Sequence, residues 1–126
     1  MITLVPISTG ELLDKLSILE IKLKKVKDAS KLENIKREHG LLLEVIKSNN
    51  LKGWKNQAER LFKINSSLWD IEDRIRIKEK LKEFDKEFVA LARSVYVTND
   101  LRFSAKSEVN EMYDSNVVEE KSYEVY

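Results

Sequence analysis

The stretch from Leu61 to Glu79, LFKINSSLWDIEDRIRIKE, decides the fold because its apolar residues recur at the spacing of an α-helix. The recurring residues are Leu61, Ile64, Leu68, Ile71 and Ile75. At spacings of three and four they form one stripe along the helix, which is typical of a helix that packs into a bundle. The stretch therefore predicts a helix with one long buried face.

A file of polar residues runs along the same stretch, between the apolar stripe and the rings of Phe62 and Trp69. Its members are Asn65, Glu72 and Arg76. Glu72 and Arg76 are four residues apart, so they can form an ion pair, and Asn65 can orient a ligand or a carboxylate from the first helix. The file indicates either a network that fixes helix register or the wall of a ligand site.

The composition predicts an all-α protein and excludes several function classes. The chain has 126 residues, which corresponds to one domain, and no proline follows Pro6. It has no cysteine and a single histidine, His39, so thiolate chemistry and a multi-histidine metal site are excluded. The formal net charge is only +1, which argues against a dedicated nucleic-acid binder and against a polybasic membrane-surface protein.

The first residues do not read as a targeting signal. The segment from Met1 to Ile7 lacks a basic region and is too short for the apolar part of a signal peptide. No apolar run approaches the length of a membrane span. We therefore expect a soluble, unprocessed protein of the cytoplasm.

The turn and capping residues predict where the helices begin and end. Ser8 with Glu11, and Ser30 with Glu33, are capping boxes that open the first two helices. The expected helices span residues 9–27, 31–48, 51–97 and 100–113, with the third either bent or broken near 77–80. We predict an antiparallel helical bundle whose first helix is buried on two sides and whose extended C-terminal tail docks against residues 2–7.

A basic and amide face on the last expected helix is the best candidate for binding an anion. It carries Asn99, Arg102, Lys106 and Asn110 and begins next to a predicted helix N-terminus, a setting that favours phosphate or carboxylate. Arg93 can reach the same place. The alternatives are an ordinary solvated face, or a clasp in which the acidic tail residues after Val118 pair with these cations.

Two Glu-x-x-Asp pairs match half of a magnesium-binding pattern. All-α nucleoside-triphosphate pyrophosphohydrolases combine such a pair with a double-glutamate motif on a preceding helix. Here the pairs are Glu11 with Asp14 and Glu111 with Asp114, but the double-glutamate partner is missing. No cofactor is therefore predicted, and magnesium enters only if the ligand carries a phosphate.

Three strings together resemble a small family of unknown function met in marine bacteria and their phages. They are ISTGELLDKL at 7–16, LARSVY with NDLR at 91–102, and EEKSY at 119–123. The resemblance covers nearly the full chain and implies an intact single domain, but no activity, substrate or cofactor. The site that it implies comprises Glu11, Asp14, Lys15, Arg93, Asn99, Asp100, Arg102, Lys106, Glu119, Glu120 and Tyr123.

Two functions remain open at this point. The first is a binding or assembly module that self-associates through the long third helix. The helix predicted by the apolar pattern there would be longer than a globular domain of this size. The second is an enzyme or binding protein for a phosphate-bearing small molecule, such as a nucleotide or a sugar nucleotide. In that case Arg93, Arg102 and Lys106 hold the anion, and Glu11, Asp14 or Glu72 supplies acid, base or metal-binding groups.

Overall fold

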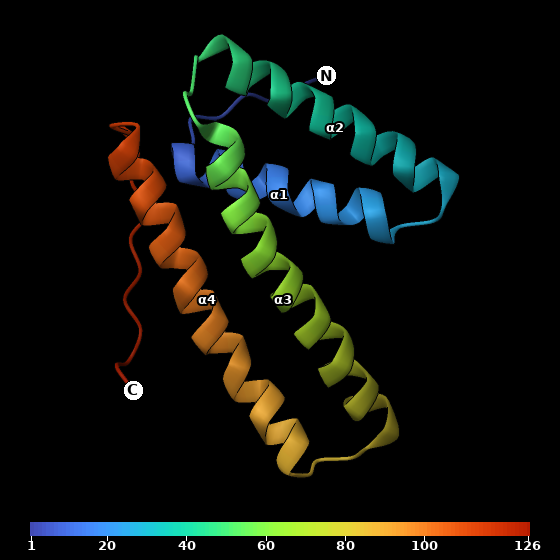
Figure 1. The fold of residues 1–126 in the computed structure, drawn as a ribbon. Coiled ribbons are helices and arrows are strands. Elements are labelled where there is room, and N and C mark those ends of the chain that lie inside the picture. Colours follow the sequence, from blue (N-terminus) through green and yellow to red (C-terminus); the bar gives the residue numbers. More distant parts are fainter.

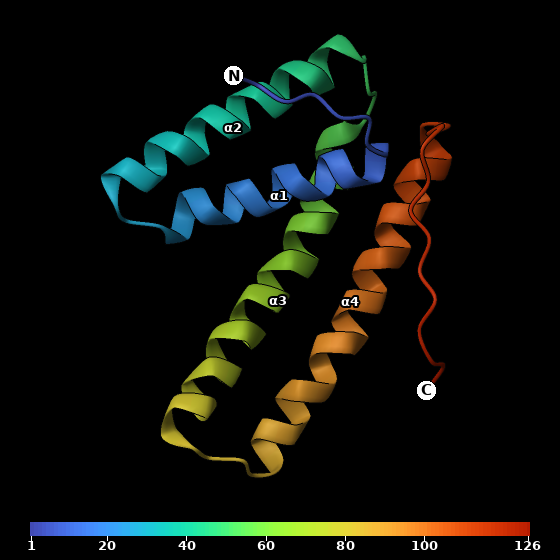
Figure 2. The same ribbon diagram turned by 180° about the vertical axis from the view of Figure 1, so that it is seen from behind.

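The computed structural model describes residues 1–126 and contains four α-helices and no strand. They are α1 (Thr9–Lys25), α2 (Ala29–Ser48), α3 (Trp54–Leu81) and α4 (Lys86–Met112). Figure 1 shows two antiparallel hairpins, α1–α2 and α3–α4, with the first crossing one end of the second. Seen from behind, the far half of the α3–α4 hairpin, nearest the turn between the two helices, has no third helix packed against it (Figure 2). The predicted all-α bundle is confirmed.

None of the four helices combines the length and the apolar character needed to cross a bilayer.

Helix α1 is the centre of the fold because it packs against each of the other three helices. The Ser8 side chain accepts a hydrogen bond from the Glu11 backbone N–H at 3.1 Å, which confirms the predicted N-cap. The main core contains Leu12, Leu13, Leu16, Ile46, Ala58, Leu61, Ala105 and Val109. Helix α1 is buried on two sides, as its apolar pattern predicts.

Helix α2 begins earlier than its capping-box pattern suggests. Asp28 is the N-cap, and its carboxylate accepts from the Lys31 backbone N–H at 3.0 Å. Ser30 instead donates its hydroxyl to the same carboxylate at 2.6 Å. The prediction that Ser30 caps this helix is therefore wrong, because the aspartate two residues earlier takes that position.

The long apolar pattern is broken at Lys82–Asp85 and not at 77–80. Lys82 ends α3 in a left-handed conformation, and Asp85 caps α4 by accepting from the Phe88 backbone N–H. The Lys78 ammonium lies 2.8 Å from Asp85 and 3.2 Å from Glu87. Lys78 therefore continues α3 and ties it to the turn beyond, which explains why the charged step at 78–80 does not interrupt the helix.

The cap-rich step Thr98–Asn99–Asp100 lies inside α4 and starts no new helix. The Asp100 carboxylate binds Lys121 and Tyr126 from the tail, and does not cap backbone N–H groups. Packing of α4 against α3 and α1 carries the helix through these weak helix formers. The predicted helix 100–113 is thus the C-terminal half of a longer one.

The C-terminal tail, residues 117–126, is extended and runs back along α4 (Figures 1 and 2). Its docking was predicted, but its partner is α4 and not the segment 2–7, which runs away from the tail in both views. Ser115 begins the reversal, since its hydroxyl accepts from the Thr9 backbone N–H and donates to the Val117 carbonyl. The tail's side chains therefore reach the face of α4 that carries Arg102 and Lys106.

Gly10 allows α1 to approach α4 closely. Its backbone N–H donates to the Asn110 side chain at 2.6 Å. A Cβ atom at this position would lie 2.4 Å from the Lys106 backbone oxygen, well inside contact distance. The crossing brings Glu11 and Asp14 to the α4 face that carries the predicted anion site.

Candidate functional site

A buried polar network joins α1, α3 and α4. Its centre is Asp14, whose side chain is fully buried. Asn65 donates its side-chain N–H to the Asp14 carboxylate and to the Ser17 hydroxyl, each at 2.8 Å. Arg102 donates Nε and Nη2 to the two Asp14 oxygens at 2.9 and 2.6 Å. The prediction that Asn65 orients a carboxylate from the first helix is confirmed.

Arg102 is held in one orientation and keeps part of its guanidinium free. Two parallel hydrogen bonds to one carboxylate fix the plane of the group. The hydrogen bonds to Asp14 raise the pKa of Arg102 above its ordinary value, although burial opposes that shift. Its Nη1 has no hydrogen bond within the chain and is not among the buried unpaired atoms, so solvent reaches it. This free nitrogen can bind an anion.

Lys106 lies one turn further along α4 and contacts two carboxylates. Its ammonium is 2.7 Å from Glu11 on α1 and 2.6 Å from Glu119 on the tail, and its side chain is only 8% exposed. Burial would lower the pKa of Lys106, but the two carboxylates outweigh that effect and raise the pKa above its ordinary value. Lys106 is therefore a charged, nearly buried cation that ties α4 both to α1 and to the extended tail.

Aromatic side chains surround the same face of α4. The ring of Tyr96 packs edge-on against that of Tyr126, with centroids 4.9 Å apart. The Lys121 ammonium lies 5.5 Å from the ring centroids of both Phe103 and Tyr123. The four rings, from α4 and from the tail, line the same space as Arg102 and Lys106.

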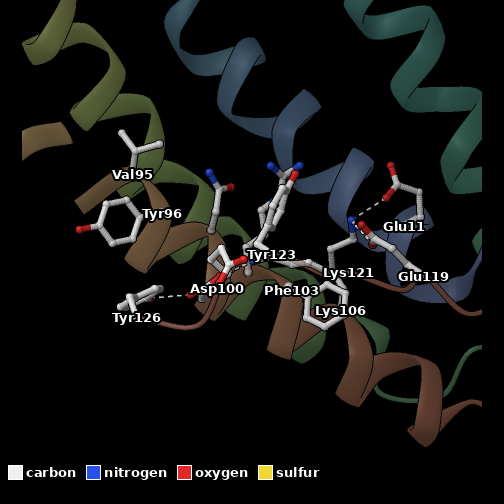
Figure 3. A pocket seen from close by; sticks show the side chains of 13 residues that line it. Glu11, Val95, Tyr96, Asp100, Phe103, Lys106, Glu119, Lys121, Tyr123 and Tyr126 are labelled. Carbon is white, nitrogen blue, oxygen red and sulfur yellow. Dashed lines mark hydrogen bonds and ion pairs between the residues drawn. The ribbon is translucent and has the colours of Figure 1, made fainter. Parts of the chain in front are cut away.

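The space between α4 and the tail is a groove of about 890 Å³, called here the α4–tail groove. Figure 3 shows the rings and charged groups that line it. Helix α4 contributes Val95, Tyr96, Asn99, Asp100, Arg102, Phe103 and Lys106, α1 contributes Glu11, and the tail contributes Glu119, Lys121, Tyr123, Glu124 and Tyr126. A groove of this size fits a nucleotide-sized molecule.

A second, smaller groove of about 400 Å³ lies between α1 and α3. This α1–α3 groove is lined by Ile18, Ile21, Asn65, Leu68, Trp69, Glu72, Asp73, Arg76 and Arg102. The predicted ion pair is present, with Arg76 Nε 3.2 Å from a Glu72 oxygen, and both side chains are exposed. Arg102 lines both grooves, so the polar file and the anion site are neighbours.

The tail's contact with Asp100 predicts release of the tail in acid. The hydrogen bond from Lys121, followed by that from Tyr126, lowers the pKa of Asp100 below its ordinary value of 3.8. A carboxylate with a lowered pKa favours the docked tail at neutral pH, and this preference is lost as the pH falls below 3.8 and through the lowered pKa. We expect NMR signals of the Tyr126 ring to shift to free-chain values over that range. Unchanged ring signals in acid, with the helices intact, would contradict this assignment.

The full length of the chain matches a protein family. A family model described as "Family of unknown function (DUF6165)" covers residues 3–126. The chain belongs to this family. No curated protein and no solved structure matches it. The α4–tail groove and the α1–α3 groove are both formed by residues inside the matched range.

The DUF6165 structure brings most of the predicted site residues together, in two places. The α4–tail groove holds Glu11, Asn99, Asp100, Arg102, Lys106, Glu119 and Tyr123, with Asp14 bound behind Arg102. Glu72 and Arg76 line the α1–α3 groove. Lys15, Arg93 and Glu120 line neither groove, and Lys15 is an exposed partner of Glu11 at 3.8 Å. The two Glu-x-x-Asp pairs do not take part in a metal cluster, since no three Asp, Glu or His side chains are grouped as a metal site.

Several groove residues were missed by sequence reasoning. They are Tyr96, Phe103, Lys121, Glu124 and Tyr126. The signal for the two α4 rings was available, because Tyr96, Asn99, Phe103 and Lys106 follow at spacings of three and four and share one helix face. Lys121 and Tyr126 carried no comparable signal, because their positions depend on how the extended tail returns along α4.

Proposed function

We propose that this DUF6165 protein binds a phosphate-bearing small molecule, a nucleotide or a sugar nucleotide, in the α4–tail groove. The single observation that carries the proposal is the arrangement of Arg102. Asp14 fixes its guanidinium from behind, the remaining Nη1 has no partner in the chain and is open to solvent, and Arg102 lines the groove. A guanidinium that is oriented in advance binds phosphate oxygens without losing side-chain freedom.

Lys106 supplies the second contact to the phosphate in this proposal. In the structure the Glu119 carboxylate lies 2.6 Å from its ammonium. A phosphate oxygen can take the place of Glu119, because both are anionic oxygen acceptors and Glu11 remains to hold Lys106 from the other side. Binding therefore exchanges one anionic partner of Lys106 for another.

The rings of the groove provide a surface for a nucleobase. Tyr123 is 82% exposed, and Phe103 lies on the α4 side of the same groove. Stacking of a base on an aromatic ring contributes about 1–3 kcal/mol per base. Asp14 has both oxygens bound to Arg102, so its role is to position that side chain, and Glu11, 2.7 Å from the Lys106 ammonium, is the carboxylate that stays beside the phosphate.

The test is calorimetric titration of nucleoside diphosphates and their sugar esters, with and without Mg²⁺, supported by melting curves. A ligand at 100 times its dissociation constant should stabilise the fold by about 2.7 kcal/mol. Tyr123→Ala should weaken binding by about tenfold through lost stacking, without loss of stability. Val125→Ala is the matched control, since Val125 is exposed on the same tail and does not line the groove. Absence of binding by all of these compounds, or an equal effect of the two variants, would refute the proposal.

Self-association is a second candidate, supported by a different part of the molecule. The far half of the α3–α4 hairpin carries apolar side chains that are more than half exposed, namely Ile77, Leu81, Phe84 and Val89. Two such hairpins can bury these residues against each other as a four-helix assembly of two chains. Sedimentation velocity should then give a dimer that Leu81→Gln converts to monomer. A monomer at all concentrations would remove this candidate.

A further inference from the structure

The α1–α3 groove combines an aromatic ring with fixed polar groups. Trp69 and Leu68 supply its apolar surface, and Glu72, Asp73 and Arg76 supply acceptors and donors. The Glu72–Arg76 pair, with atoms 3.2 Å apart, places an acceptor beside a donor. Recognition sites for small polar ligands have this composition, with a mostly apolar floor and a few placed polar groups.

A sugar ring fits this composition better than a phosphate does. A pyranose has an apolar C–H face, which packs on an indole, and a rim of hydroxyls that both donate and accept hydrogen bonds. Carboxylates accept from hydroxyl groups, and a guanidinium donates to them. The two carboxylates of Glu72 and Asp73 would repel a phosphate but not a neutral hydroxyl group.

The two grooves meet at one side chain. Arg102 lines both of them, and Asp14 holds it in place where α1, α3 and α4 come together. Because Arg102 lines both grooves, a ligand whose phosphates lie on it can extend one end into the α4–tail groove and the other into the α1–α3 groove. The α4–tail groove, with its four rings, suits the base, and the α1–α3 groove, with Trp69, suits the sugar.

The charges of the α4–tail groove favour a ligand with few negative charges. Its lining includes four carboxylates, of Glu11, Asp100, Glu119 and Glu124, against the three cations Arg102, Lys106 and Lys121. A nucleoside triphosphate would add a large negative charge to a lining that already has one more carboxylate than cations. A diphosphate esterified at both ends carries less charge, because each ester removes one ionisable oxygen.

We infer that the α1–α3 groove is a sugar subsite and that the ligand is a nucleoside diphosphate sugar bridging the two grooves across Arg102. This inference rests on the proposed function, because the phosphate contact at Arg102 sets the register of the ligand. It adds the substrate class and a binding role for Trp69 and Glu72.

The experiment compares the affinities of nucleoside diphosphates with those of their glycosyl esters, using the uridine, adenosine and guanosine pairs. At least one glycosyl ester should bind about tenfold more tightly than the matching diphosphate. Glu72→Gln should remove most of that advantage and leave the affinity of the diphosphate unchanged. Asp70→Asn is the control, because Asp70 is exposed on the same helix and does not line the groove.

A second readout reports where the sugar lies. The chain has two tryptophans, so NMR shows two indole N–H signals, which Trp54→Phe assigns. The Trp69 signal should shift with the glycosyl ester and not with the diphosphate. Equal affinity of each diphosphate and its ester, with an unmoved Trp69 signal, would overturn the sugar subsite and leave the proposed function standing. Failure of every compound to bind would overturn both.

Discussion

Replacing Arg102 with methionine is expected to destabilise the protein by about 3–5 kcal/mol, because it leaves the carboxylate of Asp14 buried without its cation. Asp14 is fully buried, and Arg102 binds both of its oxygens. Asn65 would remain as a neutral donor to one oxygen only. Urea denaturation followed by circular dichroism measures the change in the free energy of unfolding.

The matched control is Arg76→Met. Arg76 also pairs with a carboxylate, that of Glu72, but its side chain is 79% exposed. Its loss should change the free energy of unfolding by less than about 0.5 kcal/mol. The double variant Asp14→Asn with Arg102→Met should regain part of the lost stability, since no buried charge remains. Similar losses for Arg102→Met and Arg76→Met would show that the Asp14 network does not hold the three helices together.

Gly10→Ala is expected to cost about 1–3 kcal/mol, because the new methyl group would overlap the backbone of α4. The nearest atom is the Lys106 carbonyl oxygen, at 2.4 Å from the Cβ position, and backbone cannot move aside as a flexible side chain can. The substitution should also weaken ligand binding, since it pushes Glu11 and Asp14 away from α4. Thermal melting measures the first effect and calorimetric titration the second.

Gly40→Ala is the comparison for this prediction. Gly40 lies in α2 with no atom within 4 Å of its Cβ position. Alanine there should stabilise the protein by about 0.5–1 kcal/mol through helix propensity alone. Two changes of the same chemistry should thus act in opposite directions, and a stabilising Gly10→Ala would contradict the close crossing of α1 and α4.

The local signals in the sequence predicted the helices well. Ser8 caps α1 as expected, and the apolar spacing from Leu61 to Ile75 lies within one helix that packs on α1 and α4. The breaks between the helices were predicted less well. A charged or capping residue can end a helix or can bind a distant segment, and the sequence alone does not distinguish the two. Lys78 and Asp100 are examples, as each binds groups beyond its own helix turn.

The candidate site could be predicted only in part, because helix spacing groups residues of one helix but not residues of different segments. Residues that share a helix face, such as Asn99, Arg102 and Lys106, could be grouped from their spacing. Glu11 and Asp14 come next to this face only because α1 crosses α4 closely at Gly10, which is a tertiary feature. Lys121 and Tyr126 depend on the path of an extended tail that has no periodicity to read.

The central claim is that the α4–tail groove binds a phosphate-bearing ligand through Arg102 and Lys106. The most direct measurement is an NMR titration of the intact, isotope-labelled chain with nucleoside diphosphates and their sugar esters, in which every backbone amide and the Arg102 side chain are followed. We expect saturable shifts concentrated between Val95 and Lys106, in the tail from Glu119 to Tyr126, and at Arg102. Saturable shifts confined to α2 or the far end of the hairpin, or no shifts with any of these compounds, would contradict it.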